Sequence, residues 1–287
     1  MNHQGCTVIE ALNWASSFLG KNDNAGELLL MHVLGCDRTG LLLRLKERLS
    51  DDARRAFITH VRSYKKSVPV QYLIGQTDFY GRTFSVNRHV LIPRFETEEL
   101  LKGVFERSKR LFPHELTLRV LDIGTGSGVI AITLALEDAR MDVVAVDISA
   151  DALNVAKGNA ERLGALVQFV QGDWLKPFVS GGDSFDVIVS NPPYIETGAI
   201  AGLSPHVRDH EPLLALDGGE DGLACYRRII ADLPKVVREK AFVAFEVGIG
   251  QASSVADWLK TAFPSASVSI ENDMNGKERF VFTEIGF

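Results

Sequence analysis

Four consecutive residues combine an amide, two prolines and an aromatic ring: Asn191, Pro192, Pro193 and Tyr194, which follow the apolar run FDVIV. Asn-Pro often opens a turn and a second proline stiffens it, so one interpretation is a plain loop that ends a strand. The other is a site in which the amide and a carbonyl accept hydrogen bonds and the ring packs on a flat group. Only the motifs elsewhere in the chain can distinguish the loop from the binding site.

A glycine-rich turn, IGTGSG, stands between a strand-like run and a helical pattern, with glycines at 124, 126 and 128. Glycine permits positive φ and lets a ligand approach the bare backbone, while the following helix offers free N–H groups. The third glycine comes one residue earlier than in the G-x-G-x-x-G dinucleotide fingerprint. This spacing weakens a pyrophosphate-binding interpretation and leaves open a turn that serves packing alone.

Acidic residues lie at the ends of three successive strand-like runs. Asp147 ends the second run, where α/β nucleotide sites keep the carboxylate that binds ribose hydroxyls. Asp173 and Trp174 follow the third run, where the acid can accept from an adenine amino group and the ring can pack on the base. Asp122, before the glycines, either satisfies backbone N–H groups of the turn or meets a ligand ammonium group. Together these residues predict one adenosine pocket.

The elements that must position these side chains alternate between strand and helix after about residue 115. Amphipathic segments separate most of the strand-like runs, which is typical of βαβ units and of a mainly parallel sheet with helices on both faces. The predicted fold class is therefore α/β. The predicted strands are 118–123, 142–148, 166–170, 185–190, 241–247, 266–270 and 279–284.

The first part of the chain has a different periodicity. From Thr7 to about Ser67, apolar residues recur at helical spacing, which predicts a small helical bundle that ends at Pro69. The stretch DFYGRTFSV then alternates around Gly81 like a hairpin, and a helix is expected from about Glu96. We predict three regions: a helical domain, a hairpin-and-helix connector and an α/β domain, at 1–70, 71–114 and 115–287.

Charge is divided unevenly along the 287 residues. The first 90 residues hold 12 Lys and Arg against 8 Asp and Glu, net +4, and the remainder holds 19 against 29, net −10, which gives the total of −6. A basic first third suits an acidic partner, and a solvated helical surface explains it equally well. The acidic body offers no obvious basic track for nucleic acid.

The cysteine and hydropathy patterns indicate the cellular compartment and argue against disulfide, metal-binding and membrane-spanning proteins. Cys6, Cys36 and Cys225 are odd in number and far apart, which argues against a disulfide framework or a thiolate metal site. His206 and His210 lack a third metal ligand nearby, so we expect no metal. With no apolar run near 20 residues and no signal-peptide pattern, we predict a cytoplasmic protein that does not enter a membrane.

The glycine turn, Asp147 and the GDW stretch resemble the class I S-adenosylmethionine-dependent methyltransferases. That resemblance implies S-adenosyl-L-methionine as the cofactor. It also implies that the sheet order reverses between the first and fourth strands of the α/β domain, with the ligand beyond their carboxyl ends. The cofactor-binding residues that it implies are Asp122, Gly124, Thr125, Gly126, Ser127, Gly128, Asp147, Asp173, Trp174 and Asn191.

On this topology the NPPY residues lie beside the glycine turn. A planar nitrogen is a poor nucleophile because its lone pair is delocalised, and two acceptors that bind its N–H bonds can turn the lone pair toward the methyl carbon. The predicted acceptors are the side-chain oxygen of Asn191 and the rigid carbonyl of Pro192, with Tyr194 enclosing the substrate group. We predict a direct in-line displacement, with Pro193 completing the substrate site. Adenine, cytosine and glutamine nitrogens remain possible substrates.

Several stretches along the chain are similar to signatures of the HemK/PrmC family of release factor glutamine methyltransferases: PVQYLIG, FYGRTFSV, VLIPRFETE, DIGTGSGVIAI, AVDIS, FDVIVSNPPYI and ALDGGEDGL. This resemblance implies methylation of N5 of the glutamine in the Gly-Gly-Gln (GGQ) loop of peptide chain release factors, with region 1–70 recognising the substrate. We expect a monomer that does not bind nucleic acid directly.

Three positions depart from the family pattern. Arg88 and Phe95 stand where proline is usual, and His210 stands where an aromatic residue is expected. The alternatives are a ribosomal protein glutamine methyltransferase, which shares the NPPY chemistry, and a DNA adenine methyltransferase. A cofactor-binding module without catalysis is a third. The VLIPRFETE stretch and the helical N-terminal region favour release factors.

Overall fold

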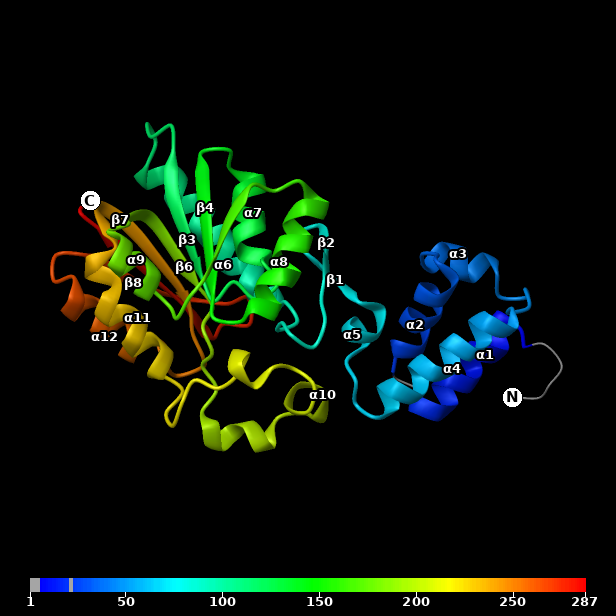
Figure 1. Cartoon of the computed structure of the whole chain (residues 1–287). Coiled ribbons are helices and arrows are strands. Elements are labelled where there is room, and N and C mark those ends of the chain that lie inside the picture. Colours follow the sequence, from blue (N-terminus) through cyan, green and yellow to red (C-terminus); the bar gives the residue numbers. More distant parts are fainter. Residues whose placement is uncertain (1–5, 21–22) are drawn as a thin grey trace. The chain divides into compact units, whose positions relative to one another are not determined.

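The computed structural model describes residues 6–20 and 23–287 and divides them into two units, which Figure 1 colours along the sequence. Unit 1 contains the described residues up to Gln76 together with Ser204–His210. Unit 2 contains Thr77–Leu203 and Glu211–Phe287. Each unit has its own buried apolar core.

Unit 1 is helical, as its periodicity predicts. Thr7 and Glu10 form a capping box that starts the first helix, each side chain binding the other residue's backbone N–H. Leu29, Leu30 and Phe57 are fully buried in the core of the unit. Its helices are α1 (Val8–Leu19), α2 (Ala25–Leu34), α3 (Arg38–Leu43), α4 (Asp51–Lys65) and α5 (Val70–Ile74).

Pro69 does not end the helical region, contrary to the sequence prediction. It precedes α5 as the N-cap residue, with φ of −56°. The ring fixes φ near the helical value, and a helix start does not need the missing N–H group, so proline begins a helix there.

The segment Ser204–His210, which contains α10 (Pro205–Arg208), groups with unit 1 although its chain neighbours belong to unit 2. The ring of His206 lies 5.0 Å from the ring of Tyr64. His210 Nε2 lies 3.3 Å from the carbonyl oxygen of Lys66. Both histidines therefore contact the end of the α4 region, and no cluster of three potential metal ligands occurs within residues 6–20 and 23–287.

Unit 2 is built on a seven-stranded sheet of order β5-β4-β3-β6-β7-β9-β8. The first five strands in this order are parallel, and β9 is antiparallel to both of its neighbours. The predicted strands and the mainly parallel α/β class are confirmed. The bounds are β3 (Leu118–Ile123), β4 (Met141–Asp147), β5 (Val167–Gln171), β6 (Phe185–Ser190), β7 (Val237–Glu246), β8 (Ser267–Asn272) and β9 (Glu278–Ile285).

Helices cover both faces of this sheet (Figure 1). Alternate residues of each strand enter different clusters: Val120 and Val187 pack on the face of α6, α7 and α8, whereas Leu121 and Ile188 pack on the face of α9, α11 and α12. The helices are α6 (Phe95–Leu111), α7 (Val129–Glu137), α8 (Ala150–Leu163), α9 (Lys176–Gly181), α11 (Ala224–Asp232) and α12 (Ala252–Ala262).

The predicted hairpin forms around Gly81 from β1 (Gln76–Phe79) and β2 (Arg82–Ser85). Phe79 and Phe84 are buried in the same apolar cluster as Leu118 of β3. The stretch predicted as a separate connector therefore packs into unit 2 from Thr77 onward, because its aromatic side chains complete the core of the α/β sheet.

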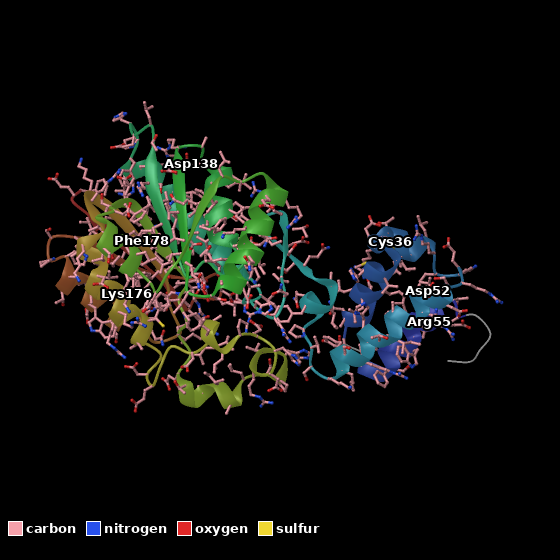
Figure 2. The ribbon with its side chains drawn as sticks, in the orientation of Figure 1. Cys36, Asp52, Arg55, Asp138, Lys176 and Phe178 are labelled. Carbon is pink, nitrogen blue, oxygen red and sulfur yellow. The ribbon has the colours of Figure 1, made fainter. Side chains whose placement is uncertain are left out.

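The three cysteines, all within the described residues, are free thiols, and Figure 2 shows Cys36 beyond the end of α2. Asp52 and Arg55 form an exposed ion pair on α4 (Figure 2). Among the helices of residues 6–20 and 23–287, none combines the length and apolar composition that a bilayer crossing requires.

Candidate active site

The glycine turn and the NPPY residues leave two neighbouring strands at the same edge of the sheet. Ile123, the last residue of β3, pairs with Ser190, the last residue of β6, and the Ser190 hydroxyl donates to the Ile123 carbonyl over 2.7 Å. Gly124 and Asn191 are the next residues, so the two motifs start side by side. Because β3 lies between β4 and β6, the chain order reverses here, where open α/β sheets bind ligands.

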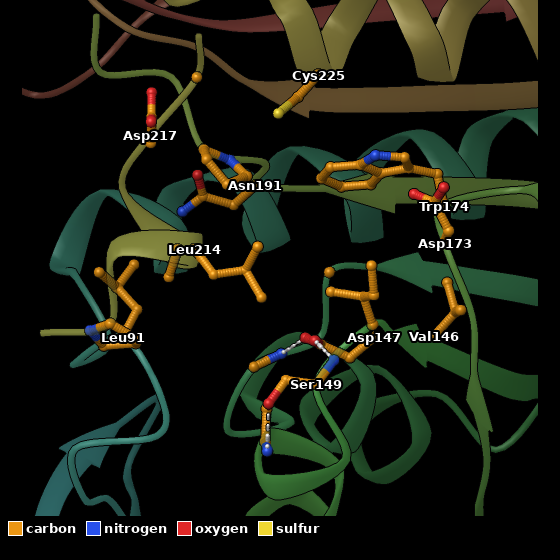
Figure 3. Close-up of a pocket in the computed structure, with 18 of the residues that line it drawn as sticks. Leu91, Val146, Asp147, Ser149, Asp173, Trp174, Asn191, Leu214, Asp217 and Cys225 are labelled. Carbon is orange, nitrogen blue, oxygen red and sulfur yellow. Dashed lines mark hydrogen bonds between the residues drawn. The ribbon is translucent and has the colours of Figure 1, made fainter. Parts of the chain in front are cut away.

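A cavity of about 370 Å³ opens at this edge (Figure 3), within the size range of small-molecule sites. It is lined from β4, from the loops that follow β2, β3, β5 and β6, and from α8 and α11. The predicted site residues that line it are Gly124, Gly126, Asp147, Asp173, Trp174, Asn191 and Pro193. Those that do not are Asp122, Thr125, Ser127, Gly128, Pro192 and Tyr194.

Asp122 lies behind the glycine turn, where it is fully buried. Its Oδ2 accepts from the Thr125 hydroxyl over 2.6 Å and from the Ala131 N–H over 3.2 Å. Burial raises the pKa of this carboxyl to about 7, against the lowering effect of those two hydrogen bonds. These two hydrogen bonds support the turn and the start of α7, while the buried Oδ1 of Asp122 has no hydrogen-bond partner within the described residues.

Gly128 has a packing role within the turn. Its φ is +85°, and a Cβ there would lie 2.9 Å from Ile132 and 3.1 Å from Ala156 of α8. The neighbouring Ser127 carbonyl accepts from Asn159 of α8 over 2.9 Å. The second half of the turn thus joins α7 to α8, while Gly124 and Gly126 face the cavity.

Asp147 presents a carboxylate to the cavity from the end of β4 (Figure 3). Its Oδ1 accepts from the Ser149 N–H and its Oδ2 from the Gly126 N–H, each over 2.9 Å. Burial raises the pKa of this group, and the backbone N–H groups oppose that effect. Because each carboxylate oxygen accepts more than one hydrogen bond, Asp147 can still bind two neighbouring hydroxyl groups of a ligand.

Trp174 faces the cavity with an uncommon backbone conformation, φ of +54°, which bulky residues seldom adopt without a functional constraint. A Cβ on Gly124 would lie 3.7 Å from its ring, so ring and glycine pack together. Asp173 Oδ2 accepts from Lys176 and Arg228, each over 2.6 Å. The bond from Lys176 is the main cause of the lowered pKa of Asp173. The Trp174 ring can therefore pack against a flat group of a ligand, whereas Oδ2 of Asp173 already accepts hydrogen bonds from two side chains of the protein.

Asn191 is held by two residues that the sequence reasoning missed. Its Nδ2 donates to the Thr97 hydroxyl over 3.1 Å, and that hydroxyl donates to Oε2 of Glu246 over 2.7 Å. Thr97 lies in the first turn of α6 and Glu246 ends β7, and both are buried. Glu246 is the one polar residue of the apolar stretch AFVAFEV, whereas Thr97 lies in the polar stretch FETE, which is part of the VLIPRFETE signature.

The chain matches two family models and is similar over nearly its whole length to curated proteins. The family described as the PrmC N-terminal domain matches residues 10–75, and the methyltransferase small domain matches residues 108–203. A Bacillus cereus protein named release factor glutamine methyltransferase is 52% identical over 281 residues, which covers 97% of this chain and 99% of that protein. A Bacillus subtilis protein of the same name is 50% identical, with 96% of each chain covered. The chain belongs to the release factor glutamine methyltransferase family.

Solved structures place this family member among the class I methyltransferase folds. A methyltransferase from Pyrococcus furiosus aligns with a TM-score of 0.52 at 15% identity, over 83% of this chain and 100% of the other. A T. thermophilus 16S rRNA methyltransferase, solved with AdoMet and guanosine, aligns with a TM-score of 0.52 at 18% identity, over 73% and 49%. At this identity the likeness concerns the fold alone.

In this member of the release factor glutamine methyltransferase family, glycines surround the backbone of Tyr194. A Cβ on Gly218 would lie 2.8 Å from the Tyr194 Cα, and one on Gly222 would lie 2.5 Å from the Tyr194 carbonyl oxygen. Gln251 Nε2 donates to the same oxygen over 2.9 Å. These contacts give the ALDGGEDGL stretch a physical reason: only glycine allows the second loop to approach the NPPY segment this closely.

Replacing Gly218 by alanine is expected to displace Tyr194 and lower kcat/KM for methyl transfer by about 10-fold or more, because inserting a methyl group into a packed site forces backbone shifts. The matched control is Gly202→Ala, since a Cβ on Gly202 meets no atom within 4 Å. Steady-state kinetics and thermal unfolding of both variants check this. Equal kcat/KM for Gly218→Ala and the unmodified protein would show that the close approach has no bearing on activity.

Proposed function

We propose that this protein transfers a methyl group from S-adenosyl-L-methionine to N5, the side-chain amide nitrogen, of the glutamine in the GGQ motif of peptide chain release factors. The observation that carries the proposal is the position of the NPPY segment directly beside the glycine turn, across the β3–β6 pair. Relatives named release factor glutamine methyltransferase, similar over nearly the whole chain, support the same substrate.

The residues at the cavity fit the cofactor. Asp147 offers a carboxylate for two ribose hydroxyls, Trp174 offers a ring face for the adenine, and Gly124 and Gly126 expose bare backbone. The T. thermophilus enzyme of the same fold was solved with AdoMet. When bound, S-adenosylmethionine supplies an electrophilic methyl group on a sulfonium centre. In this proposal, Asp122, Thr125, Ser127 and Gly128 serve the cofactor indirectly, by shaping the turn.

The NPPY residues orient the glutamine amide. The Oδ1 of Asn191 and the carbonyl of Pro192 accept hydrogen bonds from its two N–H groups, which directs the nitrogen lone pair toward the methyl carbon. Pro192 is buried and donates no competing N–H, so its carbonyl is rigid. Pro193 lines the cavity next to Asn191. The extra proton on nitrogen leaves to solvent once the methyl group is bound.

Tyr194 acts as a wall of the substrate site and takes no part in proton transfer. Burial raises the pKa of its phenol to about 12, so the side chain stays neutral near pH 7. Its backbone is held by Gln251 and by the glycines described above. A neutral ring on a fixed backbone suits a flat amide group, which it can cover without competing for the proton.

The helical unit 1 is proposed to recognise the release factor outside the GGQ loop. Its α4 carries Arg54, Arg55, Arg62 and Lys65, and the first 90 residues are net positive, which suits an acidic partner surface. We further propose that the protein acts as a cytoplasmic monomer without direct contact to nucleic acid, in the compartment where release factors work.

A parallel labelling assay tests this function. The purified protein and S-adenosylmethionine with a labelled methyl group are offered a release factor, a glycine-glycine-glutamine peptide, ribosomal proteins and DNA in separate reactions. We expect label on the GGQ glutamine of the release factor, with a much higher KM for the peptide, which lacks the surface that unit 1 recognises. Label on ribosomal protein alone, or on DNA alone, would refute the release factor as substrate.

A further inference from the structure

The buried side chains of Thr97 and Glu246 continue a chain of hydrogen bonds that starts at the Asn191 amide and ends at the Glu246 carboxylate. Asn191 donates to Thr97 over 3.1 Å, and Thr97 donates to Glu246 over 2.7 Å. The three residues come from the β6 loop, α6 and β7. Thr97 and Glu246 are 3% and 1% exposed, so water does not compete for these bonds.

The direction of this chain follows from counting protons. The Thr97 hydroxyl has one proton, and it donates that proton to Glu246, so toward Asn191 its oxygen can only accept. The Asn191 atom that faces Thr97 must therefore be the Nδ2 donor. The amide oxygen then remains available as an acceptor, which is the group that the substrate nitrogen needs.

When Glu246 carries a proton, the hydrogen bonds can also run the other way, from Glu246 through Thr97 to Asn191. A neutral carboxyl can donate to the Thr97 oxygen, and the Thr97 proton then needs an acceptor on the Asn191 side. The amide would have to rotate by about 180°, which would place Nδ2 where Oδ1 had been. A donor in that place repels the N–H bonds of the substrate amide. Only the ionised carboxylate excludes this second arrangement, so the charge state of buried Glu246 governs how firmly the Asn191 oxygen is held toward the substrate.

We propose that Glu246 and Thr97 are positioning residues that hold the Asn191 amide with its oxygen toward the substrate nitrogen, and that ionised Glu246 sets this orientation. The inference rests on the proposed role of Asn191. In this scheme Thr97 and Glu246 touch neither substrate nor cofactor, and neither lines the cavity. They act through Asn191.

Other groups face Glu246 from the elements packed around it. Arg279 of β9 lies on the attractive side, whereas Glu96 of α6 repels the carboxylate. Tyr226 of α11 donates to the Glu246 backbone carbonyl over 2.7 Å, and Tyr194 lies nearby. Burial raises the pKa of Glu246 to about 7, while hydrogen bonds from the Thr97 and Asn191 side chains and the charge of Arg279 act to lower it. The ionised fraction therefore falls as pH falls through neutrality.

Kinetics of the full-length protein with a release factor test the positioning role. Thr97→Val keeps the shape and removes the hydroxyl, and kcat is expected to fall by about 10- to 100-fold while KM for both substrates changes little. Thr97→Ser should restore kcat to near the original value. The matched control is Thr283→Val, because Thr283 is also buried and its hydroxyl has no partner within the described residues.

The pH dependence of kcat distinguishes a positioning role of Glu246 from a role in packing alone. For the unmodified protein, kcat is expected to fall on the acid side with an apparent pKa near 7, as Glu246 becomes protonated. Glu246→Gln keeps an acceptor oxygen without a titrating proton, so this acid limb should disappear even where kcat itself is lower. An unchanged acid limb in Glu246→Gln, or full kcat in Thr97→Val, would overturn the proposal.

A spectroscopic readout is independent of turnover. The side-chain amide signals of Asn191, identified by their loss in Asn191→Ala, are expected to shift with a midpoint near pH 7, and Glu246→Gln should abolish that midpoint. Signals that do not respond to pH would refute the role of Glu246. If the unmodified protein labelled no release factor, the proposed function would fail, and these signals would still decide the amide orientation.

Discussion

Replacing Asn191 by alanine is expected to lower kcat for glutamine methylation by at least about 100- to 1,000-fold, the range seen when one preorganised hydrogen-bonding group is removed from a reaction centre. The physical reason is that the amide oxygen is one of two acceptors that orient the substrate nitrogen. Affinity for S-adenosylmethionine should change far less, because Asp147 and Trp174 line the cavity from the end of β4 and from the loop after β5. Single-turnover kinetics and calorimetric titration measure the two quantities separately.

The control for this substitution is Asn154→Ala, an exposed asparagine of α8 that does not line the cavity. It should retain full kcat. Turnover at the original rate in Asn191→Ala would contradict the proposed role of the amide. A loss of cofactor binding as large as the loss of kcat would instead assign Asn191 to the cofactor site.

Replacing Asp147 by alanine is expected to weaken binding of S-adenosylmethionine by about 100-fold, since two hydrogen bonds to a charged acceptor are each worth about 1.5–3 kcal/mol and part of that is regained from water. The loss includes an indirect contribution, because Asp147 also accepts from the Gly126 N–H and holds the glycine turn. Isothermal titration of cofactor into the purified variant gives the affinity.

Two further variants separate these contributions. Asp147→Asn keeps an acceptor oxygen for one of the two backbone N–H groups, and it should bind more tightly than Asp147→Ala and more weakly than the unmodified protein. Asp142→Ala removes an exposed carboxylate from the same strand and should have no effect. A dissociation constant within about twofold of the original in Asp147→Ala would show that the carboxylate does not bind the ribose.

Most of the site was predictable from the sequence because it depends on strand ends. Parallel strands place their carboxyl ends at one edge, so residues that follow β3, β4, β5 and β6 meet there whatever the intervening helices are. Strand ends predict that Gly124, Asp147 and Trp174 meet, the class I methyltransferase resemblance adds Asn191, and all four line the cavity. The hairpin at Gly81 followed from local alternation in the same way.

The roles of the acidic residues around the glycine turn were not predictable from the sequence, because they depend on which side of the turn each side chain faces. Asp122 and Asp147 are both acids at strand ends, and only the packing shows that the first is enclosed behind the turn while the second reaches the cavity. Pro69 was expected to end a helical region and begins a helix instead, since the same fixed φ serves either outcome.

The sequence by itself determined the α/β class and seven of the residues that line the cavity, because periodicity and short motifs are local properties of the chain. Only the tertiary structure decided what holds those residues. Thr97 is 94 positions from Asn191 and 149 from Glu246, and Gln251 is 57 from Tyr194. No local pattern links positions so far apart, since such contacts exist only after the helices have packed on the sheet and buried the polar groups together.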